Sequence, residues 1–287
     1  MTKRLFILGY GFTGAAMARR LIPHGWSLTG AARSEGGRAA MASQGVRNVD
    51  PFDAEALAKV LNETDAVLIA APPDAEGCPG LKACAPALEA GARPKWIGYL
   101  STTGVYGDRG GRWVFETSAL NAHSPEGARR AGAEHDWLAT GERLGLAVHL
   151  FRLPGIYGPG RSAFERLRDG TARRIVKPGQ VFSRIHVDDL AAALETSMAR
   201  TRAGGIYNLC DDEPAPAAEV TAHAARLLGL EPPPEEPLET AGLSPMALRF
   251  YAESKRVSNA LAKAELGWRP AYPTSREGLA AILATGG

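Results

Sequence analysis

The chain has 287 residues, of which 45% are hydrophobic and 22% charged, and its formal net charge at pH 7 is +2. This composition is ordinary for a globular protein in water, and so small a net charge gives no sign of a nucleic-acid or membrane partner. No apolar stretch approaches the roughly 20 residues that cross a bilayer, and a strand begins so early that we expect no signal peptide. The three cysteines form neither a disulfide framework nor a CxxC site. We expect a cytoplasmic protein, and we predict no metal site.

Residues 4–21 predict a strand, a glycine turn and a helix. The strand is a continuous apolar run, and the helix has an apolar face at the i, i+3, i+4, i+7 spacing. A GxGxxG turn in this context is typical of a dinucleotide site. Its first glycine permits the tight turn, the second lets the backbone approach a pyrophosphate, and the third lets helix and strand pack closely. The alternative is a loop that only turns the chain. We predict all six residues of the turn as cofactor-binding: Gly9, Tyr10, Gly11, Phe12, Thr13 and Gly14.

The second predicted strand, residues 26–32, ends at Arg33 and Ser34. In a dinucleotide-binding fold this position meets the adenosine ribose, where an acidic residue suits a free 2′-hydroxyl and a cation suits a 2′-phosphate. Arg33 is such a cation, and Ser34 adds a small hydroxyl donor. We therefore predict NADP as the cofactor, with NAD as the alternative; otherwise Arg33 is a solvated surface arginine.

The third and fourth predicted strands, residues 46–49 and 66–71, bring further candidates. Asp50 is placed to accept a hydrogen bond from an adenine amino group, and it fits a plain turn residue as well. The fourth strand is an apolar run that leads into Ala70, Ala71 and Pro72. Small residues at a strand end let a cofactor backbone cross it, so we predict these three as cofactor-binding.

Strands and helices alternate at regular spacing as far as a fifth predicted strand, residues 95–100. That pattern predicts an α/β fold, a doubly wound parallel sheet of the Rossmann type. Ligands of such sheets bind beyond the carboxyl ends of the strands. The candidates above, together with residues 101–103, all stand at such ends. They support a dinucleotide site more strongly together than the glycine motif does alone.

The chain resembles the extended short-chain dehydrogenase/reductases, or NAD-dependent epimerase/dehydratases, over nearly its whole length. The resemblance rests on the glycine turn, whose spacing is common in the atypical branch of that family, and on residues 100–107, 152–160, 184–190 and 207–209. It implies a dinucleotide-binding domain at 1–156 to which 181–209 return. A smaller substrate-binding lobe is expected at 157–180 and 210–272, with a C-terminal helix at 273–287. It also implies that Pro154 lies beside the nicotinamide.

In this family, a Tyr-x-x-x-Lys pair on the helix after the fifth strand acts with a Ser or Thr from that strand. The tyrosine transfers a proton while the nicotinamide transfers a hydride, and the lysine lowers the pKa of the phenol. Thr102 matches the hydroxyl position. In the helix, alignment of Pro125 and Glu134 with the family pattern puts Glu126 in the place of the tyrosine and Arg130 in that of the lysine.

The usual proton donor is therefore missing. Arg130 can hold the nicotinamide ribose, but a permanently protonated guanidinium cannot join a proton relay. Either Glu126 with Thr102 does acid–base work in an altered reaction, or Tyr106 or Tyr157 supplies a phenol, or the site binds its cofactor without chemistry. Thr102, Glu126 and Arg130 also fit purely structural roles, as a strand-end hydroxyl, a helix-start acid and a solvated cation.

We predict an NADP(H)-binding oxidoreductase or epimerase-like enzyme that acts on a small polar carbonyl or a sugar-like substrate, nucleotide sugars included. We expect a monomer or a homodimer. The alternative is a non-catalytic NADP(H)-binding sensor or regulatory protein. Two local predictions complete the chain: residues 243–252 return to the substrate site, and residues 254–266 form a helix.

Overall fold

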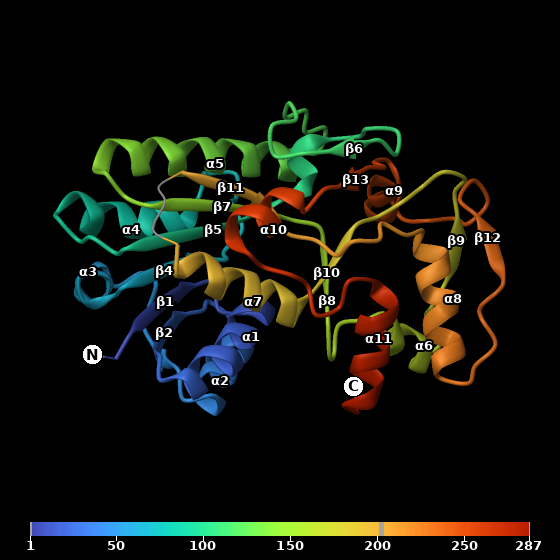
Figure 1. Ribbon diagram of the computed structural model, residues 1–287, viewed down its shortest axis with the longest axis horizontal. Coiled ribbons are helices and arrows are strands. Elements are labelled where there is room, and N and C mark those ends of the chain that lie inside the picture. The colour runs from blue at the N-terminus through green and yellow to red at the C-terminus, as the bar shows by residue number, and fades with distance from the viewer. Residues whose placement is uncertain (1, 201–203, 287) are drawn as a thin grey trace.

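The computed structural model describes residues 2–200 and 204–286, and its larger part is built on one seven-stranded sheet (Figure 1). The strand order is β11-β7-β5-β4-β1-β2-β3, and every neighbouring pair is parallel. The order reverses direction beside β1, so the predicted doubly wound Rossmann sheet is confirmed. The strands are β1 (Arg4–Leu8), β2 (Ser27–Ala31), β3 (Arg47–Asn48), β4 (Ala66–Ile69), β5 (Trp96–Thr102), β7 (Val148–Leu153) and β11 (Gly205–Asn208).

Helices cover both faces of this sheet, which is why its strands are continuous apolar runs. Successive side chains of β1 enter opposite cores: Leu5 and Ile7 join one cluster, Phe6 and Leu8 the other. The first face carries α1 (Phe12–Leu21), α2 (Glu35–Ser43), α7 (Val187–Met198) and α10 (Ala260–Leu266), and the second carries α3 (Ala54–Glu63), α4 (Pro79–Glu89) and α5 (Pro125–Leu144).

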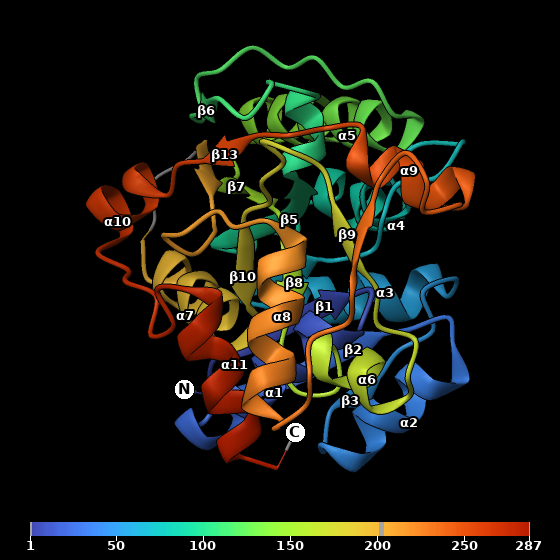
Figure 2. The same ribbon diagram turned by 90° about the vertical axis from the view of Figure 1, so that its right-hand side faces the viewer.

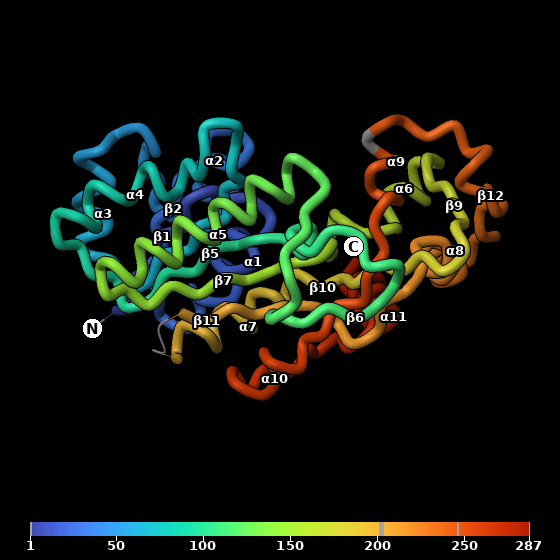
Figure 3. The backbone as a smooth tube through the Cα atoms, turned by 90° about the horizontal axis from the view of Figure 1, so that it is seen from above, coloured from blue at the N-terminus to red at the C-terminus, as the bar shows by residue number. Residues whose placement is uncertain are grey.

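A smaller lobe stands beyond the carboxyl ends of the sheet, facing the viewer in Figure 2 and to the right in Figure 3. Short parallel strand pairs and small helices make up this lobe and its junction with the sheet. The pairs are β8 (Gly155–Tyr157) with β10 (Arg184–His186), β9 (Arg174–Val176) with β12 (Glu235–Pro237), and β6 (Trp113–Val114) with β13 (Arg256–Val257). The helices are α6 (Ala163–Arg168), α8 (Ala217–Leu227), α9 (Pro245–Tyr251) and α11 (Ser275–Ala284), and two 3₁₀ turns, η1 (Ile22–His24) and η2 (Thr103–Tyr106), lie in the larger part.

The C-terminal third divides between the two parts. Residues Ala262, Leu266 and Trp268 fall within the predicted lobe segment 210–272, yet they are buried in the core of the main sheet. The predicted helix over 254–266 starts only at Ala260, because Arg256–Val257 pairs with β6 as a strand. Helix α11 packs against α8 around Leu279, so the predicted C-terminal helix is part of the lobe's core.

Within the described ranges, no helix is both long enough and apolar enough to cross a membrane.

Candidate functional site

Three adjoining cavities run along the carboxyl ends of the central strands. We name each after one residue. The Arg33 cavity measures about 640 Å³ and lies over β1, β2 and β4; its walls include Gly9, Ala31–Ser34, Pro51, Phe52, Ala70–Pro72 and Lys82. The Gly11 cavity, about 310 Å³, is lined by Gly9, Gly11–Thr13, Ala70, Leu100–Thr102, Arg130, Leu153, Pro154, Ile156 and Arg161. The Lys255 cavity, about 580 Å³, opens toward the lobe and is lined by Thr102–Gly104, Ser124, Glu126, Pro154, Gly155, Val181–Ser183, Arg249, Phe250, Glu253, Lys255 and Val257.

Shared walls join the three cavities into one trough. Gly9 and Ala70 line both the Arg33 and the Gly11 cavity. Thr102 and Pro154 line both the Gly11 and the Lys255 cavity. A long ligand can therefore cross the sheet's edge from β2 to β7 and meet a second ligand at Thr102. This is the shape that a dinucleotide and a substrate require at the switch point of a doubly wound sheet.

The three glycines of the turn differ in what a side chain would meet. Gly9 has φ +95°, and a Cβ there would lie 2.4 Å from the Ala71 backbone nitrogen. A Cβ at Gly11 would have its nearest neighbouring atom 3.9 Å away, so a side chain there would project into open cavity space. A Cβ added at Gly14 would lie 3.0 Å from the nearest atom of the Tyr10 ring. Gly14 therefore leaves room for the Tyr10 ring within the turn. It does not line the cavities, whereas Phe12 and Thr13 do.

At the far end of the trough, Arg33 is exposed and lines the wall of its cavity with Ser34. The Ser34 oxygen accepts a hydrogen bond from the Gly37 N–H (3.1 Å) and so caps α2, which keeps the strand end in place. Asp50 does not line this cavity. Its carboxylate accepts from the Phe52 N–H (2.9 Å), as in a turn, and the neighbouring Phe52 reaches the cavity instead.

The three predicted catalytic residues gather at the other end of the trough. Thr102 ends β5, and its side-chain oxygen accepts from the Gly104 N–H at 3.1 Å. Glu126 stands exposed in the first turn of α5, on the wall of the Lys255 cavity. Arg130, one turn further, lines the Gly11 cavity and donates to the Leu100 carbonyl. These residues lie where the two cavities meet, with the arginine on the Gly11 side and the carboxylate on the Lys255 side.

A buried polar network fixes the strand end that carries Thr102. The Ser101 hydroxyl donates to Glu134 (2.5 Å), and Glu134 forms an ion pair with Arg152 (2.8 Å) whose side chains are only 3% and 4% exposed. Burial opposes the charge on Arg152, but its bonds to Glu134 outweigh that effect and raise its pKa. Arg152 also donates to the Tyr106 hydroxyl (3.0 Å). The network therefore ties α5 to β5 and β7 directly beneath the site.

Neither of the alternative phenols lines the trough. The buried Tyr106 hydroxyl donates to Asn208 (2.7 Å) while it accepts from Arg152. Tyr157 is buried against Gly278, where even a Cβ would meet its hydroxyl at 2.0 Å. Burial raises the pKa of both phenols. In the described part of α5 and of the trough's walls, Tyr10 is the tyrosine present, and it belongs to the glycine turn.

Two groups on the trough's walls were not predicted as site residues. Lys255 is 9% exposed, its ammonium lies 2.5 Å from the Glu253 carboxylate, and both line the cavity named after it. Phe250 of α9 stacks on Phe182, with ring centroids 4.3 Å apart, as an aromatic wall of the same cavity. Thus residues 243–252 do reach this cavity, and the buried ammonium follows just beyond them. A lone Lys in a loop gives no sequence signal of this kind.

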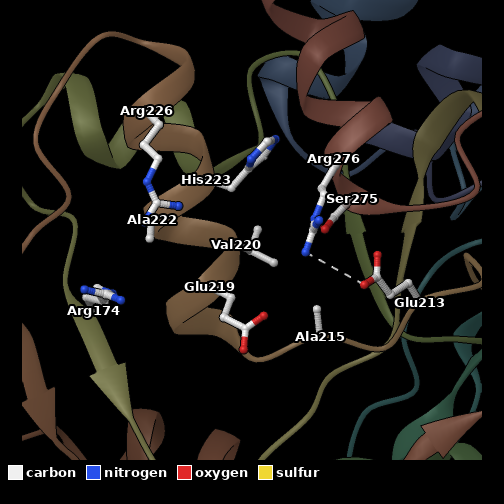
Figure 4. A pocket seen from close by; sticks show the side chains of 10 residues that line it. All are labelled: Arg174, Glu213, Ala215, Glu219, Val220, Ala222, His223, Arg226, Ser275 and Arg276. Carbon is white, nitrogen blue, oxygen red and sulfur yellow. Dashed lines mark ion pairs between the residues drawn. The ribbon is translucent and has the colours of Figure 1, made fainter.

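A fourth cavity, about 230 Å³, lies in the lobe between α8 and α11 and shares no lining residue with the trough (Figure 4). Its side chains carry charges of both signs, and Arg276 faces Glu213 at 4.0 Å. Among the residues that the structure describes, no group of three or more His, Cys, Asp or Glu side chains is placed to hold a metal ion.

Comparison with known proteins gives two long relatives. Protein YeeZ of Escherichia coli K12 is 32% identical, over 80% of this chain and 86% of its own. A solved structure of a conserved protein of unknown function from Silicibacter pomeroyi DSS is 44% identical, with a TM-score of 0.92 over 99% of both chains. A 3-diazoavenalumate denitrifying reductase of Streptomyces sp. is 34% identical over 52% of this chain and 51% of its own. No family model matches the chain.

Among solved enzymes, a dTDP-glucose 4,6-dehydratase from Bacillus anthracis in complex with NAD shares the fold: its TM-score is 0.80, over 99% of this chain and 96% of its own, at 19% identity. The sheet order, the glycine turn and the lobe define a Rossmann-fold protein of the nucleotide-binding class. More closely, the chain belongs to the same family as protein YeeZ, and it shares the fold of the NAD-dependent epimerase/dehydratases, the extended short-chain dehydrogenase/reductases.

Proposed function

We propose that this protein binds NADP(H) along the trough and is an oxidoreductase or epimerase-like enzyme, acting on a small polar carbonyl or sugar-like substrate in the Lys255 cavity. One observation carries the proposal: the Arg33, Gly11 and Lys255 cavities are joined at Gly9 with Ala70 and at Thr102 with Pro154. A dinucleotide fits this sequence of spaces with its adenosine in the first and its nicotinamide at the last junction.

The residues present suit such a cofactor. Gly11 leaves open the space that any side chain would fill. Ala70, Ala71 and Pro72 line the first cavity and add little bulk to its wall. The exposed cation Arg33 at the end of β2 favours a 2′-phosphate, and hence NADP, over a free ribose hydroxyl.

A bound nicotinamide would supply or accept a hydride at the junction. The Thr102 oxygen already accepts from Gly104, so its O–H is free to donate to a substrate oxygen. Arg130 stays charged and holds its place on the Leu100 carbonyl, so it positions a ligand and relays no proton. Glu126 lines the Lys255 cavity, so we propose that it exchanges a proton with the substrate, and the Lys255–Glu253 pair is a second candidate.

A calorimetric titration with NADPH and with NADH tests the proposal. We expect one site that binds NADPH more tightly than NADH. Equal or tighter NADH binding would overturn the role of Arg33, and binding of neither would overturn the whole proposal.

A second candidate function follows from the missing phenol: a non-catalytic NADP(H)-binding sensor or regulatory protein. It is favoured by Glu126 and Arg130 standing where the family has tyrosine and lysine. The two functions differ in one measurement. The enzyme consumes NADPH with a member of a carbonyl and sugar panel, whereas the sensor binds NADPH tightly and turns over none of them.

We also propose that the protein is a monomer or a homodimer, which sedimentation measures.

A further inference from the structure

Arg161 lines the trough and takes no part in the proposed hydride or proton transfer. Arg161 follows Gly160 at the point where the chain leaves the main sheet for the lobe. Its side chain lines the Gly11 cavity, across from the start of α1, and its guanidinium carbon lies 5.5 Å from the centre of the Phe12 ring. A segment that begins the lobe thus reaches back over the glycine turn.

The backbone holds this arginine in place. Gly158 and Arg161 exchange two backbone hydrogen bonds, of 3.1 and 3.0 Å, and Gly160 takes φ +73° between them. The turn is packed onto α1, because a Cβ at Gly158 would lie 3.1 Å from the Phe12 ring. Substitution of Gly158 would therefore push the turn off the helix. This close fit sets the distance between Arg161 and the glycine turn.

Arg161 contacts the Phe12 ring, but no carboxylate among the described residues neutralises its charge. Other arginines of the same segment are paired, Arg173 with Glu236 and Arg174 with Glu235 (2.8 Å). In the part of the chain that the structure describes, no acidic side chain lies within ion-pair distance of Arg161. The cavity in front of it is lined by backbone at Gly9 and Gly11, and α1 has no acidic residue in its first turn. The cavity is thus lined by two cations, Arg130 and Arg161, and, within the described chain, by no acidic side chain.

We propose that Arg161 is a ligand for the diphosphate of the dinucleotide and closes the Gly11 cavity over it from the lobe side. The inference rests on the proposed function, because it assumes that a dinucleotide lies in the trough. A guanidinium is suited to this task, since its planar set of N–H donors can contact two phosphate oxygens at once. The guanidinium lies within cation–π distance of the Phe12 ring, which keeps it beside the glycine turn.

Three ligands separate this role from that of Arg33: NADPH carries a diphosphate and a 2′-phosphate, ADP-ribose carries the diphosphate alone, and 2′-AMP carries the 2′-phosphate alone. We expect Arg161→Ala to lower the affinity for NADPH and for ADP-ribose by about 10- to 100-fold, as for loss of one charge-assisted contact. Its affinity for 2′-AMP should stay unchanged. Arg161→Lys should recover part of the loss, because it restores the charge without the planar donors.

Arg166→Ala is the matched control, because Arg166 is an exposed cation of the neighbouring helix α6 that lines none of the three cavities. It should bind all three ligands as the wild type does. Unchanged ADP-ribose affinity in Arg161→Ala, or an equal loss in Arg166→Ala, would overturn the inference. Failure of the wild type to bind NADPH or ADP-ribose would instead overturn the proposed function, so the two failures are distinguishable.

Discussion

Thr102 and Pro154 stand at the ends of neighbouring strands, and both line the Gly11 cavity and the Lys255 cavity at the point where these two cavities join. Thr102 is in register with Leu153, the residue before the proline. Parallel strands end at the same edge of a sheet, so this pairing places a hydroxyl and a rigid apolar ring on either side of the junction. The proposed chemistry takes place at this point.

Thr102→Ala tests whether that hydroxyl acts on substrate. We expect NADPH affinity to stay within about twofold and NADPH oxidation to fall by about 10- to 100-fold, as for loss of one hydrogen bond to a reacting oxygen. Thr102→Ser keeps the hydroxyl and should keep most of the rate. Stopped-flow single turnovers with a substrate found in the panel give the measurement. Equal rates for Thr102→Ala and the wild type would remove Thr102 from the reaction.

Glu126→Gln keeps the size of the side chain and removes its proton exchange. The rate should fall by about 100-fold or more, in the range of general acid–base catalysis, with cofactor binding unchanged. Asp136→Asn, an exposed acid further along α5, is the control and should leave the rate as it is. Should Glu126→Gln retain full rate while a Lys255→Met variant loses it, the proton would pass through the Lys255–Glu253 pair instead.

Arg33→Ala should lower the affinity for NADPH by about tenfold, the effect expected when one exposed charge contact with a phosphate is lost. Binding of NADH, which has no 2′-phosphate, should not change. Arg47→Ala offers a control, since Arg47 is an exposed cation of β3 that lines none of the three cavities. Calorimetry on the three proteins checks this, and a parallel loss for both cofactors would argue against a contact with the 2′-phosphate.

Arg152→Ala should lower the free energy of unfolding by about 3–5 kcal/mol, because it leaves the Glu134 carboxylate buried without its cation. Arg143→Ala removes an exposed ion pair, with Glu89 at 3.1 Å, and should cost less than about 1 kcal/mol. Urea unfolding measures both. Similar midpoints for the two variants would mean that the buried network does not hold the strand end.

The buried carboxyl of Asp211 should make the stability of the protein depend on pH. Burial raises the pKa of this carboxyl to about 8, and its Oδ2 atom has no hydrogen-bond partner. In the unfolded chain the pKa is about 3.9. Its contribution to stability is therefore complete below about pH 4 and is lost as pH rises toward 8, at up to about 1.4 kcal/mol per pH unit.

Asp211→Asn imitates the protonated form and should abolish this fall. The variant should match the wild type in urea unfolding near pH 4 and exceed its stability at pH 8.5. A wild type equally stable at both pH values, or a variant destabilised at pH 8.5, would contradict the raised pKa.

The main sheet and its glycine turn could be predicted because their signals are local. Strands such as β4, buried on both faces, must be apolar throughout, and the turn at Gly9 needs a residue that tolerates positive φ. Thr102, Glu126 and Arg130 were identified through the family resemblance, which expects a hydroxyl at this strand end and a residue pair in the next helix, and their catalytic role stays a prediction. Their adjacency in space follows from the parallel sheet.

The lobe and its side of the trough gave much weaker signals. Strand β13 has two residues, Arg256–Val257, and is a strand only because β6 pairs with it from far away in the sequence. Lys255 becomes a buried ammonium only through this pairing and its contact with Glu253. The chain returns from the lobe and buries Trp268 in the core of the main sheet, and no local sequence pattern predicts this return. Asp50 was expected to bind the cofactor because of its position, but its carboxylate instead accepts a hydrogen bond from the Phe52 N–H within its own turn.

The most direct test of the dinucleotide trough compares NADPH binding by the wild type and by Gly11→Val. The backbone at Gly11 has φ −144° and ψ −146°, outside the left-handed region that favours glycine, and the added side chain would project into the Gly11 cavity. We expect a single NADPH site in the wild type and a loss of affinity of at least about 100-fold in the variant, with the variant still folded at the temperature of the titration. NADPH binding of unchanged affinity in Gly11→Val, or no binding by the wild type, would contradict it.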